Sequence, residues 1–268
     1  MNCGFHQSKD SISNKYGNTI QIFSQNPKEF YKNKTIEKIK ELDDFKYVFT
    51  HAQYIISLTK LTKEGKLNST YINSILYELR FLHQYKGGIG AVIHAGSADI
   101  EDDKCYKTII AYLNTINKYI DKDNKCQCII ENMATCGNKV IDTVDKMITF
   151  NTYIIKFKLS ERVSFCFDTC HDHVSTYIKY NSIPTDHTID KHLQKLIDNK
   201  VHVSIVHLNN TKSHTKDEHE DLELGLIPVN EILLVIEICK KNEIPMIVER
   251  INSTKEEKEK MLTLINIY

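Results

Sequence analysis

Residues 162–209 read RVSFCFDTCHDHVSTYIKYNSIPTDHTIDKHLQKLIDNKVHVSIVHLN and contain two apolar β-type runs separated by a segment with helical periodicity. The first run is RVSFCFDT and the second is VHVSIVHLN, while the span from Thr188 to Asn199 has apolar residues at helical spacing. A strand, a helix and a second strand in this order are typical of parallel sheets, because parallel partners need a crossover connection. The stretch therefore predicts a strand–helix–strand unit.

The same unit recurs along most of the chain, which has eight short β-type runs in all. The other six are MNCGFH, NTIQIFS, YVFTHA, IGAVIHAGS, CQCIIENM and IPMIVER. Further helical candidates lie between the runs, at residues 33–45, 69–84, 105–121, 140–156 and 229–242. The segment between the first two runs is short, so its helix is expected to be reduced or missing. Strand and helix repeated eight times in about 250 residues predict an α/β fold of the (β/α)8 TIM barrel type.

No proline- or glycine-rich linker divides the chain, since its 4 prolines and 9 glycines are scattered. We therefore expect a single domain over residues 1–268, which closes with a helix in ERINSTKEEKEKMLTLINIY after a charged loop. The hydrophobic content of 41% and the charged content of 26% are ordinary for a globular protein with an ample core.

No run approaches the roughly 18 to 20 apolar residues of a membrane span, and MNCGFHQSKD lacks the apolar stretch of a signal peptide. We expect a cytoplasmic protein without a membrane partner, or a nuclear or virion protein if the source is eukaryotic or viral. Several of the 8 cysteines lie inside apolar runs, where reduced thiols pack as small hydrophobes. The formal net charge is zero, so no global basic field of the kind common in nucleic-acid binders is present.

Side chains that bind metals stand where the apolar runs end. Five are histidines and four are carboxylates: His51, His94, Glu131, Asp168, His171, His207, Asp217, His219 and Glu249. In a TIM barrel the C-terminal ends of the strands meet at one mouth, so these groups should converge. One histidine on a strand is more often structural than a ligand, but nine such groups at successive strand ends are not expected by accident. Imidazole and carboxylate are zinc-type ligands, and nine exceed what one ion can use, which predicts two or three ions.

The expected charge of this centre indicates an anionic substrate. Four carboxylates offset part of the charge of three divalent ions and leave about +2. A phosphodiester fits such a site, because paired ions about 3.5 to 4 Å apart can hold the attacking and the leaving oxygen. Hydrolysis then needs no protein nucleophile. A Ser/His/Asp arrangement and a nucleotide-binding fingerprint are absent from the sequence, so we expect no nucleotide cofactor.

The segments HAQYIISL, VIHAGS, IIENMATCG, CFDTCHDHVSTY, VHLNNTKS, DEH and PMIVER together resemble the endonuclease IV family of apurinic/apyrimidinic endonucleases, within the xylose isomerase-like barrels. The resemblance spans nearly the whole chain, and the motifs come in the family's order. It implies a (β/α)8 barrel with three zinc ions that acts in base excision repair. Such an enzyme cuts duplex DNA 5′ to an abasic site and leaves a 3′-hydroxyl and a 5′-deoxyribose phosphate.

The resemblance also implies a ligand set for each of the three zinc ions. The first ion takes His51 and His94, with Glu131 bridging it to the second. The second ion adds Asp168, His207 and Glu249. The third ion takes His171, Asp217 and His219. Glu131 and Glu249 are thereby implied in catalysis, Glu131 as the bridge and Glu249 as a group that also orients the attacking water.

Contacts with DNA follow from the same resemblance. Tyr54 and Ile55, in HAQYII, match the tyrosine and the apolar residue that the family inserts into the duplex at the lesion. Such a wedge costs stacking energy, which is least where a base is already missing. Lys28, in IFSQNPKEF, lies near the position of a DNA-contacting arginine, so a planar, bidentate group is replaced by a lysine here. The loop from His207 to Asp217 is shorter than in bacterial members. A single mouth facing one duplex predicts a monomer.

Two other functions compete with this interpretation. A sugar isomerase or epimerase of the xylose isomerase-like barrels also places Glu, Asp, His and Glu on strands five to eight, but it leaves the other five groups unused. A lesion-binding or scaffold protein without turnover predicts the loss of at least one ligand, and none is lost. His6, His173 and His214 lie close to the motifs, and Asn209 and Lys212 are candidates for orienting the loop or meeting a phosphate. The three histidines are candidates for lining the mouth, and neither Asn209 nor Lys212 receives a catalytic role.

Overall fold

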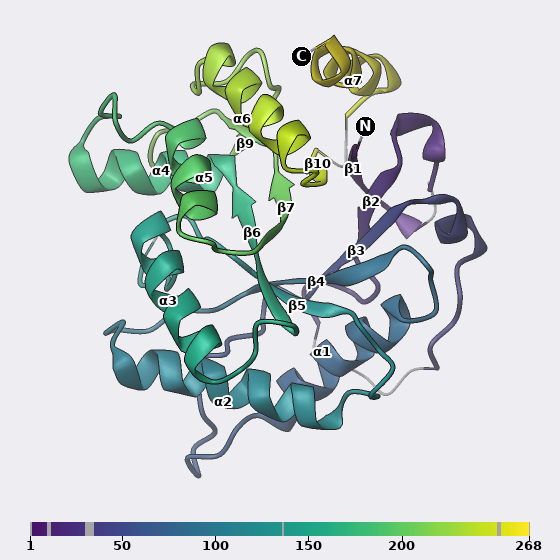
Figure 1. Ribbon diagram of the computed structural model, residues 1–268, viewed down its shortest axis with the longest axis vertical. Coiled ribbons are helices and arrows are strands. Elements are labelled where there is room, and N and C mark those ends of the chain that lie inside the picture. Colours follow the sequence, from purple (N-terminus) through teal and green to yellow (C-terminus); the bar gives the residue numbers. More distant parts are fainter. Residues whose placement is uncertain (1, 10–11, 30–34, 136, 251–252, 268) are drawn as a thin grey trace.

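A closed barrel of eight parallel strands forms the centre of the computed structural model, which describes residues 2–9, 12–29, 35–135, 137–250 and 253–267 (Figure 1). The barrel strands are β1 (Cys3–Gln7), β2 (Thr19–Ile22), β3 (Tyr47–His51), β4 (Gly88–His94), β5 (Gln127–Glu131), β6 (Val163–Asp168), β7 (Val203–His207) and β10 (Met246–Val248). Each strand pairs in parallel with its neighbour along the chain, and β10 closes the barrel against β1. The eight predicted strands and the (β/α)8 barrel are therefore confirmed.

Helices cover the outside of the barrel from β3 onward (Figure 1). They are α1 (Ser69–Leu82), α2 (Asp103–Tyr119), α3 (Val144–Lys156), α4 (Thr169–Tyr180), α5 (Ile189–Asp198), α6 (Val229–Lys241) and α7 (Lys255–Ile267). Six of the seven match predicted helices to within a few residues. The exception is α4, which has no clear apolar stripe in the sequence. Its N-cap is Asp168, whose side chain accepts a hydrogen bond from the His171 backbone N–H at 2.8 Å.

Two short 3-10 helices stand where full helices would follow β1 and β2, namely η2 (Asn14–Tyr16) and η3 (Lys40–Asp44). The reduced helix after β1 was expected. The helix predicted over residues 33–45 is wrong for the described part of that range, because only η3 is helical there. The backbone N–H of Ile39 donates to the Tyr85 hydroxyl at 2.8 Å, and Leu42 and Phe45 donate to carbonyls three residues back. These bonds hold the segment on the barrel wall without an α-helical ladder.

Inside the barrel, six side chains pack as one cluster beneath the strand ends. They are Phe49, Val92, Ile129, Cys166, Ile205 and Ile247, and all are fully buried. Because side chains alternate along a strand, the residue two positions further faces the same interior. Those residues are His51, His94, Glu131, Asp168, His207 and Glu249. One layer of apolar residues thus supports one layer of predicted ligands, all at the C-terminal mouth.

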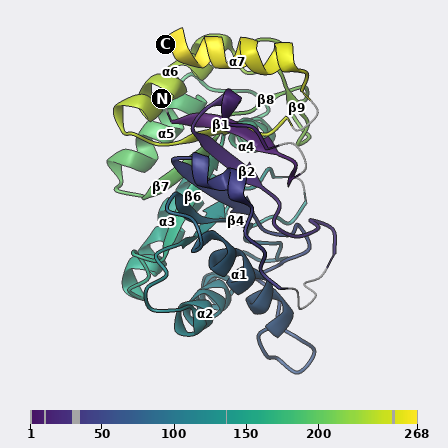
Figure 2. The ribbon, with the colours of Figure 1, turned by 90° about the vertical axis from the view of Figure 1, so that its right-hand side faces the viewer.

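The last helix, α7, lies beside the first strand of the barrel and packs against η2 and β1 (Figure 2). The ammonium of Lys258 on α7 lies 5.8 Å from the ring centroid of Phe5 in β1. The seven cysteines in the described part of the chain are free and buried, as expected for reduced thiols. Among the described residues, no helix is both long and apolar enough to cross a lipid bilayer.

Candidate metal centre

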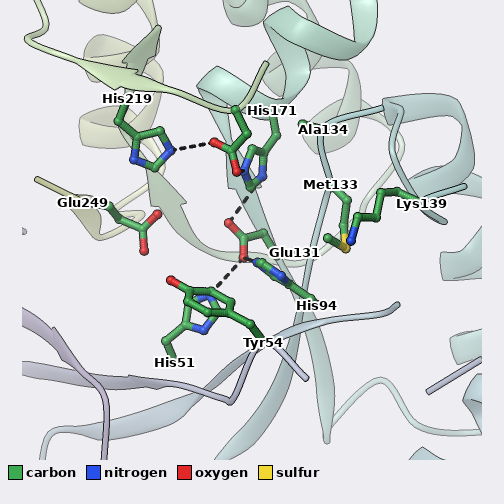
Figure 3. Close-up of a pocket in the computed structure, with 11 residues that line it drawn as sticks. His51, Tyr54, His94, Glu131, Met133, Ala134, Lys139, His171, His219 and Glu249 are labelled. Carbon is green, nitrogen blue, oxygen red and sulfur yellow. Dashed lines mark hydrogen bonds and ion pairs between the residues drawn. The ribbon is translucent and has the colours of Figure 1, made fainter. Parts of the chain in front are cut away.

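Glu131, at the end of β5, is the point on which the predicted ligands converge (Figure 3). Its carboxylate is fully buried, and its Oε2 lies 2.9 Å from Nε2 of His94 and 3.3 Å from Nε2 of His51. Its Oε1 lies 2.9 Å from Nδ1 of His207. His94 stands directly beside Glu131 in the sheet register. One carboxylate therefore faces two groups of imidazoles, as a bridging ligand would.

A second group gathers around the end of β7. Nδ1 of His207 lies 3.2 Å from Oε2 of Glu249 and 3.8 Å from Oδ2 of Asp168. One ligand atom from each of Glu131, Asp168, His207 and Glu249 lies within 4.8 Å of the others, a spacing that suits a shared ion. The register supports this group, since Asp168 and His207 are directly paired in neighbouring strands.

The third group lies further out, between α4 and a small hairpin. Nε2 of His171, on the first turn of α4, is 3.1 Å from Oδ2 of Asp217, and Nε2 of His219 is 3.3 Å from Oδ1 of Asp217. The hairpin consists of β8 (Asn210–Thr211) and β9 (His219–Glu220). The Cys170 thiol lies 3.9 Å from Oδ1 of Asp217, so it borders this group. The structure thus brings together all nine predicted residues.

Hydrogen bonds to the far nitrogen of each ring orient three of the imidazoles. Nδ1 of His51 lies 2.8 Å from its neighbour's carbonyl, that of Ala52, and Nδ1 of His171 lies 2.8 Å from the Asn132 carbonyl. Nε2 of His207 lies 2.9 Å from Oε1 of Gln21. If each far nitrogen donates, the nitrogen left facing the carboxylates is a free acceptor, which is the arrangement of metal-binding histidines.

Three amide side chains, those of Gln21, Asn132 and Asn209, hold the carboxylate residues in place. Sequence reasoning did not single out Gln21 or Asn132. Gln21 Nε2 donates to Oε1 of Glu249 at 2.8 Å. Asn209 Nδ2 donates to Oδ2 of Asp168 at 2.7 Å, and its Oδ1 accepts from the Glu249 backbone N–H at 3.0 Å. Asn132 Oδ1 accepts from the Asp168 backbone N–H at 2.6 Å. The only sequence signal for Gln21 is a polar residue inside the apolar run NTIQIFS.

The protonation preferences of the cluster indicate a need for positive charge. Burial raises the pKa of Glu131, but the imidazoles of His207 and His94 outweigh it and hold that pKa well below its usual value. Burial alone would lower the pKa of His207, yet the facing Cys166, Glu249 and Glu131 keep it well above the ordinary imidazole value. His207 thus takes up a proton to balance the buried carboxylates, whereas burial lowers the pKa of His94. Divalent ions would supply the same charge, so the donor set fits a polynuclear metal centre.

The centre opens into a cavity of about 340 Å³. Most of the predicted ligands line its wall, together with four other residues, Tyr54, Met133, Ala134 and Lys139 (Figure 3). Tyr54 is 49% exposed, and its ring centroid lies 5.1 Å from that of His51. Tyr54 therefore stands at the rim, where a large ligand could touch both the tyrosine and the cluster.

The other predicted DNA contacts flank this rim. The Tyr54 backbone N–H donates to the carbonyl of Pro27 at 3.0 Å, which places the loop with Lys28 beside Tyr54. Lys28 is exposed and Ile55 is half-buried. Lys139 is the one lysine or arginine among the described residues that line the cavity, and no ion pair involves it in the described part of the chain. Sequence reasoning missed it, since a lone lysine in a loop carries no signal.

The remaining candidates differ in how close they come. His6 reaches the centre, with its Nδ1 accepting from Gln21 Nε2 at 3.0 Å and lying 3.5 Å from Oε1 of Glu249. His173 and His214 face each other, with Nε2 of His173 3.0 Å from Nδ1 of His214. Lys212 does not line the cavity and pairs with Glu220 at 3.6 Å. Of these four, His6 alone joins the interior network.

The chain is similar to known proteins over most of its length. Residues 16–265 match the family described as xylose isomerase-like TIM barrel. A protein of Acholeplasma laidlawii named "Probable endonuclease 4" is 30% identical over 257 residues, which cover 87% of this chain and 80% of that protein. Endonuclease IV from Thermus thermophilus superposes with a TM-score of 0.69 at 19% identity, covering 100% and 98% of the two chains. A D-tagatose 3-epimerase-like protein superposes with a TM-score of 0.72 at 15% identity, covering 100% and 97%. The two structural likenesses concern the fold alone.

Proposed function

The chain belongs to the endonuclease IV family of xylose isomerase-like TIM barrels, and on that premise we propose that it hydrolyses the phosphodiester bond 5′ to abasic sites in duplex DNA. The products are a 3′-hydroxyl and a 5′-deoxyribose phosphate, as in base excision repair, and the protein acts as a monomer. The single observation that carries the proposal is the convergence of five histidines and four carboxylates at one mouth of the barrel, because this set exceeds the needs of a one-metal or two-metal barrel.

Three zinc ions are proposed as cofactors. His51, His94 and Glu131 hold the first, and Glu131, Asp168, His207 and Glu249 hold the second. His171, Asp217 and His219 hold the third. When bound, such ions polarise the scissile phosphate and lower the pKa of a water molecule, which supplies a nucleophile near neutral pH. The two-sided contacts of the Glu131 carboxylate support its role as the bridge.

Glu249 is the proposed group that orients the attacking water. Its side chain is 12% exposed and lines the cavity, whereas the Asp168 side chain is fully buried. Burial raises the pKa of Glu249, but His207 outweighs it and holds the pKa well below the usual value, so the group is ionised at neutral pH. An ionised carboxylate that solvent can reach is able to accept a hydrogen bond from water, and Gln21 and Asn209 hold it in place.

The rim is proposed to hold the DNA. Tyr54 and Ile55 enter the duplex at the lesion, and Lys28 contacts the backbone beside them. The exposure of an aromatic ring next to the ligands supports this role for Tyr54. Lys139 adds a positive charge inside the cavity and is proposed to contact a phosphate.

The test is incision of a duplex oligonucleotide with one tetrahydrofuran abasic analogue by the zinc-loaded protein. This analogue cannot undergo β-elimination, so every cut is hydrolytic. We expect a cut on the 5′ side by the wild type and by Asp186→Asn, which changes a carboxylate that is 80% exposed and does not line the cavity. Glu131→Gln should not cut. An uncut duplex, with protein shown to contain its metals, would refute the proposal.

A sugar epimerase is the alternative that the fold allows, since a D-tagatose 3-epimerase-like protein has the same barrel. That chemistry uses Glu131, Asp168, His207 and Glu249 alone. The other five groups also converge here, with Asp217 lying between His171 and His219. A one-metal epimerase gives these five no role, which favours the nuclease. Turnover of a ketose without incision of DNA would reverse this choice.

A further inference from the structure

Two histidines that the proposed centre does not use face each other beside its third metal position. Nε2 of His173, on α4, lies 3.0 Å from Nδ1 of His214. The His214 ring also stacks on Tyr177, with ring centroids 4.3 Å apart and an angle of 12° between the planes. His173 and Tyr177 are four residues apart, so they lie on the same face of α4. Together the three rings join a loop to a helix.

His214 lies in the hairpin that carries Asp217 and His219. Its strands β8 and β9 pair over only two residues each, and the Lys212 N–H donates to the Glu218 carbonyl at 2.9 Å. So short a hairpin has little stability of its own. Asp217 is 47% exposed and is three residues from His214, a span of about 10 Å at most. Contact between His214 and α4 therefore limits where Asp217 can lie.

His173 in turn depends on His214. The His173 residue is 2% exposed, and its Nδ1 has no hydrogen-bond partner among the described residues. Its hydrogen bond to His214 is thus what satisfies this buried imidazole, and burial of an unsatisfied ring is unfavourable. The hydrogen bond and the stack act in the same direction, since both favour the docked position of the hairpin.

We propose that His214 is a positioning residue that anchors the β8–β9 hairpin to α4 and so sets the affinity of the third metal position. This inference rests on the proposed function, because it assumes that His171, Asp217 and His219 hold one ion. His171 comes from α4, whereas Asp217 and His219 come from the hairpin. The anchor joins these two elements. A phenylalanine at this position would keep the stack on Tyr177, which is the closer of the two ring contacts of His214, but it would lose the hydrogen bond to His173.

The test counts metal ions in the purified full-length protein. The wild type, His214→Ala, His214→Phe and His202→Ala are loaded with zinc, dialysed against chelators of graded strength and analysed by elemental mass spectrometry. His202 is the control, because it is an exposed histidine just before β7, at the opposite end of the barrel. We expect three ions in the wild type and the control. His214→Ala should retain two, with the dissociation constant of the third raised about tenfold or more. His214→Phe, which keeps the stack but not the hydrogen bond, should bind the third ion more tightly than His214→Ala and less tightly than the wild type.

Each outcome bears on a different part of the reasoning. If His214→Ala keeps the third ion with wild-type affinity, the anchor is refuted and the proposed function stands. If His214→Phe loses that ion as readily as His214→Ala, the ring stack on Tyr177 does not hold the hairpin, and the part of the inference that rests on the stack is overturned. Fewer than three ions in the wild type would contradict the proposed function itself. If His214→Ala does not fold, the comparison of His214→Phe with the wild type still tests the anchor.

Discussion

Replacement of Gln21 by leucine should weaken metal binding, although Gln21 is not itself a proposed ligand. Gln21 lies on β2, fully buried, on the far side of His207 from the proposed ions. Its Oε1 accepts from Nε2 of His207 at 2.9 Å, and its Nε2 donates to Oε1 of Glu249 at 2.8 Å. Leucine has a similar size but makes neither bond. The variant therefore removes a hydrogen bond from one histidine and from one carboxylate of the same site without replacing any proposed ligand.

The size of the effect follows from these two bonds. A hydrogen bond to a charged group contributes about 1.5 to 3 kcal/mol net, so two bonds at the lower end give about 3 kcal/mol, or roughly 150-fold. Residues that orient metal ligands typically change metal affinity by about 10- to 100-fold. We expect Gln21→Leu to lower the affinity of the ions next to His207 by about 10- to 100-fold.

The assay is competition for zinc against a chromophoric chelator at fixed pH. Ser164→Ala is the control, since Ser164 is also buried in the barrel but its hydroxyl has no hydrogen-bond partner among the described residues. That control should bind zinc as the wild type does. A change of less than about threefold in the zinc affinity of Gln21→Leu would refute the claim that the Gln21 amide orients His207 for metal binding.

Three further predictions concern the reaction, the DNA and the fold. Glu131→Gln should lower kcat/KM for incision by at least about 10²-fold, because it removes the negative charge of the carboxylate that faces His94 and His207. Near-normal rates would exclude a bridging role for Glu131. Lys139→Met should weaken DNA binding and reduce the slope of log affinity against log salt by about one, measured by fluorescence anisotropy, and an unchanged slope would remove Lys139 from the interface. Burial raises the pKa of Glu78 above 4.5 despite its bonds to Ser24 and Gln25. Its ionised form therefore destabilises the fold above the raised pKa, and stability is regained as the pH falls through that value toward 4.5. Glu78→Gln should be at least as stable as the wild type at pH 7 and lose this advantage near pH 4.5, as chemical denaturation would show; a neutral-pH loss of stability would contradict it.

The barrel and the nine candidate ligands could be predicted because both depend on local patterns. Six of the eight apolar runs end at a predicted ligand, and period-two alternation places that ligand above a buried residue, as with Ile129 and Glu131 or Ile205 and His207. Parallel strands that close a barrel then bring the ends together. Convergence is thus a consequence of topology, and the sequence carries the information for it in short segments.

Residues that support the ligands carry no such local signal. Gln21 contacts His207 and Glu249, which lie 186 and 228 residues away along the chain. Such pairs exist only once the barrel has closed. Helix α4 was missed for another reason. It begins at the cap formed by Asp168, and its buried face carries polar residues, so the sequence lacks the apolar stripe that predicts a helix. Within the described residues 35–45 of the helix expected before β3, only the 3-10 helix η3 forms, and the Tyr85 hydroxyl accepts a hydrogen bond from the Ile39 N–H.

The two kinds of ligand position also differ in how firmly the fold holds them. His51, Glu131, Asp168 and His207 stand on strand ends above the packed barrel interior, and their side chains are at most 2% exposed. Asp217 belongs to a short hairpin, is 47% exposed and has only neighbouring ligands and the Cys170 thiol as described partners. A strand end cannot move without disturbing the core, whereas a hairpin can shift at little cost. The geometry of the third position must therefore come from contacts made outside it, such as the ring stack on α4.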